Sequence, residues 1–199
     1  MNDAHRLVQA CYDGLDAASA LLDVEPGLLN ARTDLGETAL HYLVYENEME
    51  SVQWLFERGA ALDTLSELLM SPLADAAHLG HAELVDWLLD NGASVDLPDQ
   101  AMPTLTAAAS GGNSAGVARI LATGVDASVV GRRNWTAMHF ACGNDRHLAV
   151  VRLLLAAGAG LNDKRHSGET PLDVAIKAGA HRIAELLRAR GAISDRQQV

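Results

Sequence analysis

Apolar residues return along the chain at an interval close to 33 residues. One leucine or methionine marks each copy, at Leu40, Leu73, Leu105, Met138 and Leu172. A glycine follows on the same interval, at Gly59, Gly92, Gly124, Gly158 and Gly191. A fixed period of this length predicts a solenoid of stacked repeats. Because a solenoid offers an extended surface and no deep central crevice, the pattern favours a protein that holds another macromolecule.

The clearest copy predicts two short helices. Ser71 is a good N-cap, and Pro72 suits the first helical position, where its missing N–H costs nothing. Apolar residues then recur at helical spacing as far as Gly80, and a second apolar row runs to Gly92. Neither helix is long enough to be stable alone in water, so each depends on packing against neighbouring copies.

Several short motifs of this unit resemble those of the ankyrin-repeat family. The chain's versions of the family's opening motif are Thr170-Pro171-Leu172-Asp173 and Thr38-Ala39-Leu40-His41. The middle and the end of the family's unit resemble Gly80-His81-Ala82-Glu83-Leu84-Val85 and Leu88-Leu89-Asp90-Asn91-Gly92-Ala93. The resemblance implies an all-α fold, an ankyrin-repeat solenoid of about six stacked helix-turn-helix units with exposed loops.

The copies differ enough to place boundaries within a single ankyrin-repeat domain over residues 1–199. We expect a degenerate N-terminal capping repeat at 1–32, repeats at 33–65, 66–97, 98–130 and 131–164, and a C-terminal capping repeat at 165–199. The third full copy lacks a good N-cap, since Met102 and Pro103 precede Thr104 there. The last copy carries Arg182, Arg188 and Arg190, which suit an outer face that no neighbour covers.

Partners of ankyrin repeats usually contact the loop tips and the exposed face of each first helix. Transferred by register, the resemblance implies a partner-binding site made of Glu37, Tyr42, Tyr45, Glu46, Leu68, Met70, Asp75, His78, Met102, Arg133, Trp135 and Phe140. The same register puts Ala107 and Ser110 on this face in the third full copy.

Two features strengthen this expectation. Leu68 lies in a tip where a polar turn is expected, and Tyr42, Tyr45 and Phe140 project from the predicted concave side, where aromatic residues serve as interface anchors. Alternatives stay open: Leu68 and Leu69 could extend a helix or pack on a neighbouring tip. Trp135 could be a packed flank.

The charge is unevenly distributed. Residues 1–100 contain 19 Asp and Glu against 3 Lys and Arg, a net charge of −16; residues 101–199 contain 7 against 12, which gives +5. An acidic N-terminal half repels phosphates and so argues against a nucleic-acid partner. It favours a basic protein partner, but acidity also keeps a protein dispersed, and the two interpretations have equal weight.

Composition and the chain's beginning favour a cytoplasmic protein. No apolar run approaches the ~18 residues that a membrane span needs, so no membrane association is expected. The first residues lack a secretory signal pattern. Cys11 and Cys142 lie far apart and suit reduced thiols in a reducing compartment. We expect a monomer.

Candidate chemistry is weak throughout the chain. His78 and His81 have a plausible metal spacing but no third ligand nearby in sequence, and His139 occupies a position that the family uses for capping. Cys142 falls in a packed slot three residues after His139, where a thiol is inert. The sequence therefore predicts no catalytic residue, cofactor or metal.

Three functional hypotheses follow. The first is a non-catalytic module that binds a protein through its concave face and loop tips. The second is an acidic inhibitor or immunity-type protein that blocks a basic toxin or enzyme. The third, an enzyme built on these repeats, would need a catalytic pocket that no pattern in the sequence indicates.

Overall fold

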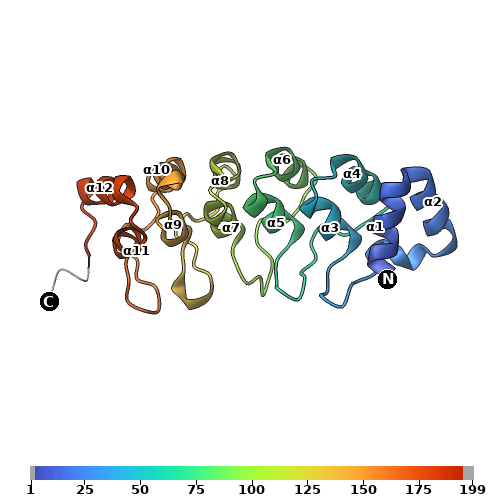
Figure 1. Ribbon diagram of the computed structural model, residues 1–199, viewed down its shortest axis with the longest axis horizontal. Coiled ribbons are helices and arrows are strands. Elements are labelled where there is room, and N and C mark those ends of the chain that lie inside the picture. The colour runs from blue at the N-terminus through green and yellow to red at the C-terminus, as the bar shows by residue number, and fades with distance from the viewer. Residues whose placement is uncertain (1–2, 195–199) are drawn as a thin grey trace. The chain divides into compact units, whose positions relative to one another are not determined.

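The computed structural model describes residues 3–194 and consists of paired helices joined by loops (Figure 1). The elements are α1 (Asp3–Asp13), α2 (Leu15–Val24), η1 (Pro26–Asn30), α3 (Ala39–Tyr45), α4 (Met49–Glu57), α5 (Pro72–Leu79), α6 (Ala82–Asp90), α7 (Thr104–Ser110), α8 (Ser114–Leu121), η2 (Arg132–Asn134), α9 (Ala137–Ala141), η3 (Asp145–His147), α10 (Leu148–Ala156), α11 (Pro171–Ala178) and α12 (His181–Ala189). Within these residues the α-helices form the six pairs that the sequence predicts, and the all-α repeat fold is confirmed.

The described part divides into two compact units. The first contains the residues up to Ala76 together with Glu83–Ala101, and the second contains Ala77–Ala82 and the residues from Met102 onward. In the second unit α8, α10 and α12 form one row, α7, α9 and α11 form another, and the loops extend beyond the second row (Figure 1). The boundaries expected for a single domain over 1–199 stay a prediction.

Short side chains cap the first helix of most pairs. In α11 the Thr170 hydroxyl accepts a hydrogen bond from the Asp173 N–H, and the Asp173 carboxylate accepts one from the Thr170 N–H. The Ser71 hydroxyl accepts from the Ala74 N–H at the start of α5, as expected. Helix α7 follows Pro103 and has no side-chain cap, as the missing N-cap predicts. Leucine, valine and alanine fill the core between the helices.

A repeated hydrogen bond joins successive copies just after α4, α6, α10 and α12. A backbone N–H of one copy donates to a side-chain oxygen about 31 residues earlier. The pairs are Ala61 with Asn30 (3.0 Å), Ser94 with Asp63 (2.9 Å), Gly160 with Ser128 (3.0 Å) and Ile193 with Asn162 (2.8 Å). These bonds hold each loop in register with the preceding copy and so position the loop tips.

Candidate binding site

A pocket in the first unit gathers most of the acidic and aromatic candidates. Its volume is about 190 Å³, and we call it the acidic pocket; its lining residues are Glu37, His41, Tyr42, Tyr45, Glu46 and Asp75. Helix α3 supplies three of them, because positions 41, 42 and 45 fall on adjacent faces of one helix. Asp75 lies in the first turn of α5. The sequence predicted all of these residues except His41.

The two central carboxylates of the acidic pocket differ from ordinary surface acids. Burial and the charge of Glu37 raise the pKa of Asp75 to about 6. The Asp75 carboxylate makes no hydrogen bond or ion pair within residues 3–194. In the same range, Glu37 Oε2 is buried and lacks a hydrogen-bond partner. Glu37 Oε2 and the Asp75 carboxylate thus line one pocket without hydrogen-bond partners among the described residues.

The two tyrosines of the acidic pocket have different surroundings. Tyr42 is half-buried, its ring lies 4.7 Å from that of His5, and burial together with a hydrogen bond to Glu37 raises its pKa. Tyr45 is 58 % exposed. Tyr42 therefore belongs to the pocket wall, whereas Tyr45 lines the same pocket and is largely exposed.

His41 has the structural role that the family resemblance implies. Its Nδ1 lies 3.1 Å from the Thr38 N–H and 3.0 Å from the Thr38 hydroxyl. Because Nδ1 accepts from a backbone N–H, the neutral ring carries its proton on Nε2. Burial lowers the pKa of His41 to about 4, so the ring stays neutral at physiological pH. His41 therefore caps α3 and carries no charge, so the ionised groups of the acidic pocket are its carboxylates.

A second pocket, in the second unit, carries the opposite charge. Its volume is about 440 Å³, and its lining residues are Arg133, Trp135, Arg165, His166 and Ser167. The Arg165 guanidinium lies 4.4 Å above the Trp135 ring and forms an ion pair with Glu169. The Trp135 ring lies 4.5 Å from that of Phe140. Trp135 is thus packed between neighbours, as its alternative interpretation proposed, while part of its surface stays accessible.

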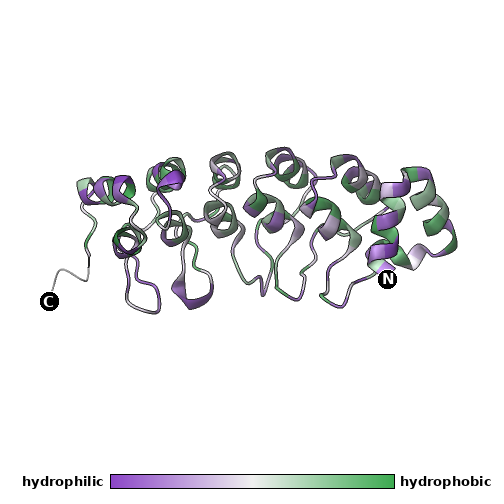
Figure 2. Ribbon diagram, in the orientation of Figure 1, coloured by the Kyte–Doolittle hydropathy of each residue, from purple (hydrophilic) through white to green (hydrophobic). Residues whose placement is uncertain are grey.

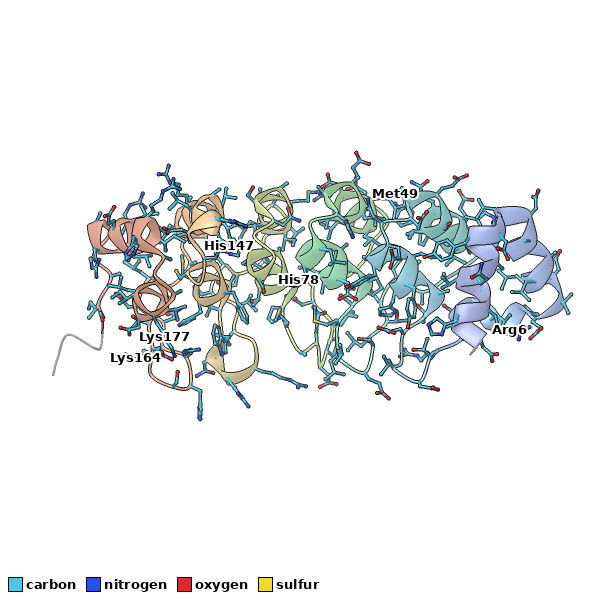
Figure 3. The ribbon with its side chains drawn as sticks, in the orientation of Figure 1. Arg6, Met49, His78, His147, Lys164 and Lys177 are labelled. Atoms are coloured by element: carbon cyan, nitrogen blue, oxygen red, sulfur yellow. The ribbon has the colours of Figure 1, made fainter. Side chains whose placement is uncertain are left out.

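The tip of this second pocket is strongly basic. Arg133 and Asn134 adopt left-handed backbone conformations, and the Arg133 carbonyl accepts a hydrogen bond of 2.9 Å from the His166 N–H. The loop around η2 is a hydrophilic stretch in Figure 2. Lys164 and Lys177 lie on the same loop side of this unit (Figure 3), and Lys177 is 3.5 Å from Glu169. The second unit therefore presents cations where the first presents acids.

The remaining candidates divide into exposed and covered residues. Leu68 is 74 % exposed in a tight turn, so this segment does not extend a helix; the turn closes through the Leu69 N–H and the Ser66 carbonyl, 2.8 Å apart. Met70 and Met102 are half-buried, and His78 is exposed on α5 (Figure 3). The expectation for Ala107 was wrong: it is fully buried, because α7 is enclosed over Thr104–Ala109.

Comparison with family profiles identifies the family to which this repeat belongs. The profile described as "Ankyrin repeats (3 copies)" matches residues 7–99 and 105–198, which is most of the chain. The chain is an ankyrin-repeat protein. Ankyrin repeats are protein-protein interaction modules, so both pockets lie in a type of fold that binds proteins.

The relatives of this ankyrin-repeat protein are much longer. It is 34 % identical to human "Ankyrin repeat and SOCS box protein 16" over 159 residues, 75 % of this chain and 35 % of that protein. It is 28 % identical over 182 residues to chicken "Nuclear factor NF-kappa-B p105 subunit", 86 % of this chain and 18 % of the relative. It is also 28 % identical over 191 residues to the Caenorhabditis elegans "Ankyrin repeat and KH domain-containing protein mask-1", 94 % of this chain and 7 % of the relative.

The nucleophile candidates of this ankyrin-repeat protein are buried. Burial raises the pKa of Cys142 to about 12 and that of Cys11 to about 11, so neither thiol ionises at neutral pH. His139 is bound in its cap, with Nδ1 2.9 Å from the Thr136 hydroxyl and Nε2 3.2 Å from the Glu169 carbonyl. Within residues 3–194, no three His, Cys, Asp or Glu side chains cluster as a metal would require.

No helix in the described part of this ankyrin-repeat protein combines the length and the apolar character needed to cross a bilayer. The site residues that were not predicted are His41, Arg165, His166 and Ser167. The last three lie in the loop between α10 and α11. The sequence indicates these residues only through the repeated tip position. That position recurs in every copy, so it does not single out this loop.

Proposed function

We propose that this ankyrin-repeat protein binds a protein partner through its concave face and loop tips and carries out no catalysis of its own. The observation that carries the proposal is the exposure of Tyr45 and Leu68 in the first unit. A large apolar side chain that contributes little to the core is typical of a residue kept for contact. Tyrosine in particular supplies contact area at a small entropic cost.

The charge of the first half supports a partner with a basic surface. Residues 1–100 carry a net charge of −16, and three of their carboxylates line the acidic pocket. Complementary charge accelerates association, and the acceleration weakens as salt screens it over ~8–10 Å. A nucleic-acid partner is disfavoured, because phosphates would be repelled by the first unit.

The test is affinity capture from the native host with the wild type and three variants, followed by mass spectrometry. Tyr45→Ala and Leu68→Ala should each lose at least about tenfold in partner recovery, as interface anchors do, with unchanged melting temperatures. Glu57→Ala, an exposed change on α4, is the matched control and should recover the partner like the wild type. Equal recovery by all forms would contradict the proposal, and a collapse of stability would show that the two side chains belong to the core.

The same acidity favours a second candidate, an inhibitor or immunity-type protein that blocks a basic toxin or enzyme. Its test is the activity of the captured partner, measured free and in a one-to-one complex at low and high salt. Loss of activity in the complex supports the inhibitor, and a partner that stays fully active removes it.

We further propose that the chain acts as a monomer in the cytoplasm, where its two thiols stay reduced. Light scattering tests whether the chain is a monomer.

A further inference from the structure

The acidic pocket contains two carboxylates, those of Glu37 and Asp75, with acceptor oxygens that no hydrogen bond within the described residues satisfies. Glu37 precedes α3, Asp75 lies on α5, and the charge of Glu37 acts on Asp75. Within residues 3–194, the Asp75 carboxylate has no hydrogen-bond partner, and Glu37 Oε2 is buried without one. A buried carboxylate is costly unless a cation or donors compensate it, so this arrangement predicts an external cation.

The walls of the acidic pocket indicate what kind of cation fits. Tyr45, which is 58 % exposed, and Tyr42, whose hydroxyl is hydrogen-bonded to Glu37, both line the pocket. Aromatic rings attract a cation that lies over their face. The volume of about 190 Å³ is several times the about 30 Å³ that one water molecule takes in the liquid, so a side-chain head group fits.

We infer that the acidic pocket receives an arginine side chain of the protein partner, with its guanidinium between Glu37 and Asp75 and against the Tyr45 ring. Arginine is favoured over lysine because its planar group carries five donors in a fixed fork and stacks on aromatic faces. Two acceptors on separate elements match a fork better than a single ammonium. The inference rests on the proposed function and adds the chemistry of the contact.

The acidity of Asp75 supports this arrangement. Burial, and to a lesser extent the charge of Glu37, raise its pKa to about 6, so the fold disfavours the ionised carboxylate. A guanidinium at the same place would remove this penalty, since an opposite charge within a few ångströms favours the ionised form. The ionised carboxylate therefore costs free energy in the free chain, and the ligand would remove that cost. This is the pattern expected of a binding site.

The experiment uses three capped amino acids as probes: Nα-acetyl-arginine methylamide, the corresponding lysine derivative, and the citrulline derivative, which has nearly the shape of arginine without its charge. Binding is followed by NMR through the ring signals of the tyrosines. The arginine probe should shift the Tyr42 and Tyr45 signals in a saturable way. The citrulline probe should leave them in place, and the lysine probe should bind more weakly than arginine.

Two controls separate this pocket from general attraction to an acidic protein. Tyr12 lies in another acidic surround, with Asp13, Asp16 and Glu48 nearby, so its signal reports non-specific attraction. The Glu37→Gln/Asp75→Asn variant should weaken arginine binding by about ten- to hundredfold, the effect of losing charge-assisted hydrogen bonds. Glu57→Gln should bind like the wild type.

Several outcomes would overturn the inference. Arginine and citrulline could shift the signals equally, Tyr12 could respond as strongly as Tyr45, or the double variant could bind arginine unchanged. Stronger binding of lysine would refute the choice of arginine. Failure of the inference and failure of the proposed function can be told apart. If the double variant captures the partner as well as the wild type, only the pocket inference is refuted. If the pocket binds arginine but no form of the chain captures a protein, the proposed function is refuted.

Discussion

Replacing Asp75 by asparagine should stabilise the first unit at neutral pH. The pKa of Asp75 rises from 3.8 to about 6 on folding, through burial and the charge of Glu37. Each pKa unit corresponds to about 1.4 kcal/mol, and solvent screening reduces the effect, so the ionised carboxylate costs the fold about 1–3 kcal/mol. Above pH 6 the carboxyl is ionised in the folded and the unfolded chain, and the wild type bears the whole cost. Below pH 3.8 both forms are protonated and the cost vanishes.

The assay is urea unfolding of the wild type and Asp75→Asn at pH 7.5 and pH 4. Trp54 and Trp87 lie in the first unit, so tryptophan fluorescence reports its unfolding when both proteins carry the Trp135→Phe change. The gain in free energy of unfolding should be present at pH 7.5 and should largely disappear at pH 4. Glu57→Gln, which also removes one charge but at an exposed position, should show no comparable gain. A gain of equal size at both pH values would refute the electrostatic explanation, and a loss at pH 7.5 would show that the carboxylate stabilises the fold.

Three further changes test other parts of the fold. His41 should contribute acid sensitivity: between pH 6.5 and 4 the unfolded chain binds a proton there that the folded chain does not, so about 3 kcal/mol of stability should be lost on acidification. The His41→Gln variant should lack this part of the pH profile in the same urea assay. Gly111→Ala should cost about 1–3 kcal/mol, because a Cβ there would lie 1.8 Å from the carbonyl oxygen of His78. Calorimetry should show a lower melting temperature than for Gly143→Ala, whose Cβ would meet only an ordinary contact. Leu69→Gly should raise the melting temperature by relieving about 1 kcal/mol of left-handed strain, and an unchanged or lower value would contradict this.

The sequence predicted the positions of elements better than the burial of side chains. Pro72 starts α5 and Pro103 precedes the uncapped α7, because capping depends on residues adjacent in the chain. The burial of Ala107 could not be predicted, since it depends on what the neighbouring helices contribute. The register placed Asp75 on the predicted binding face but gave no sign that its carboxylate would be half-buried beside Glu37. Predicting the burial of such a side chain requires the positions of the side chains in the neighbouring copy as well.

The tie between a loop backbone and a short oxygen-bearing side chain one copy earlier has an evolutionary consequence. Asparagine, aspartate and serine all serve at this position, at Asn30, Asp63 and Ser128 among others. The junction thus demands little of the residues around it, and most of a copy can diverge while still docking on its predecessor. Duplication or loss of one copy would bring together two copies that can form the same hydrogen bond. The number of repeats could therefore change without a new kind of contact between neighbours.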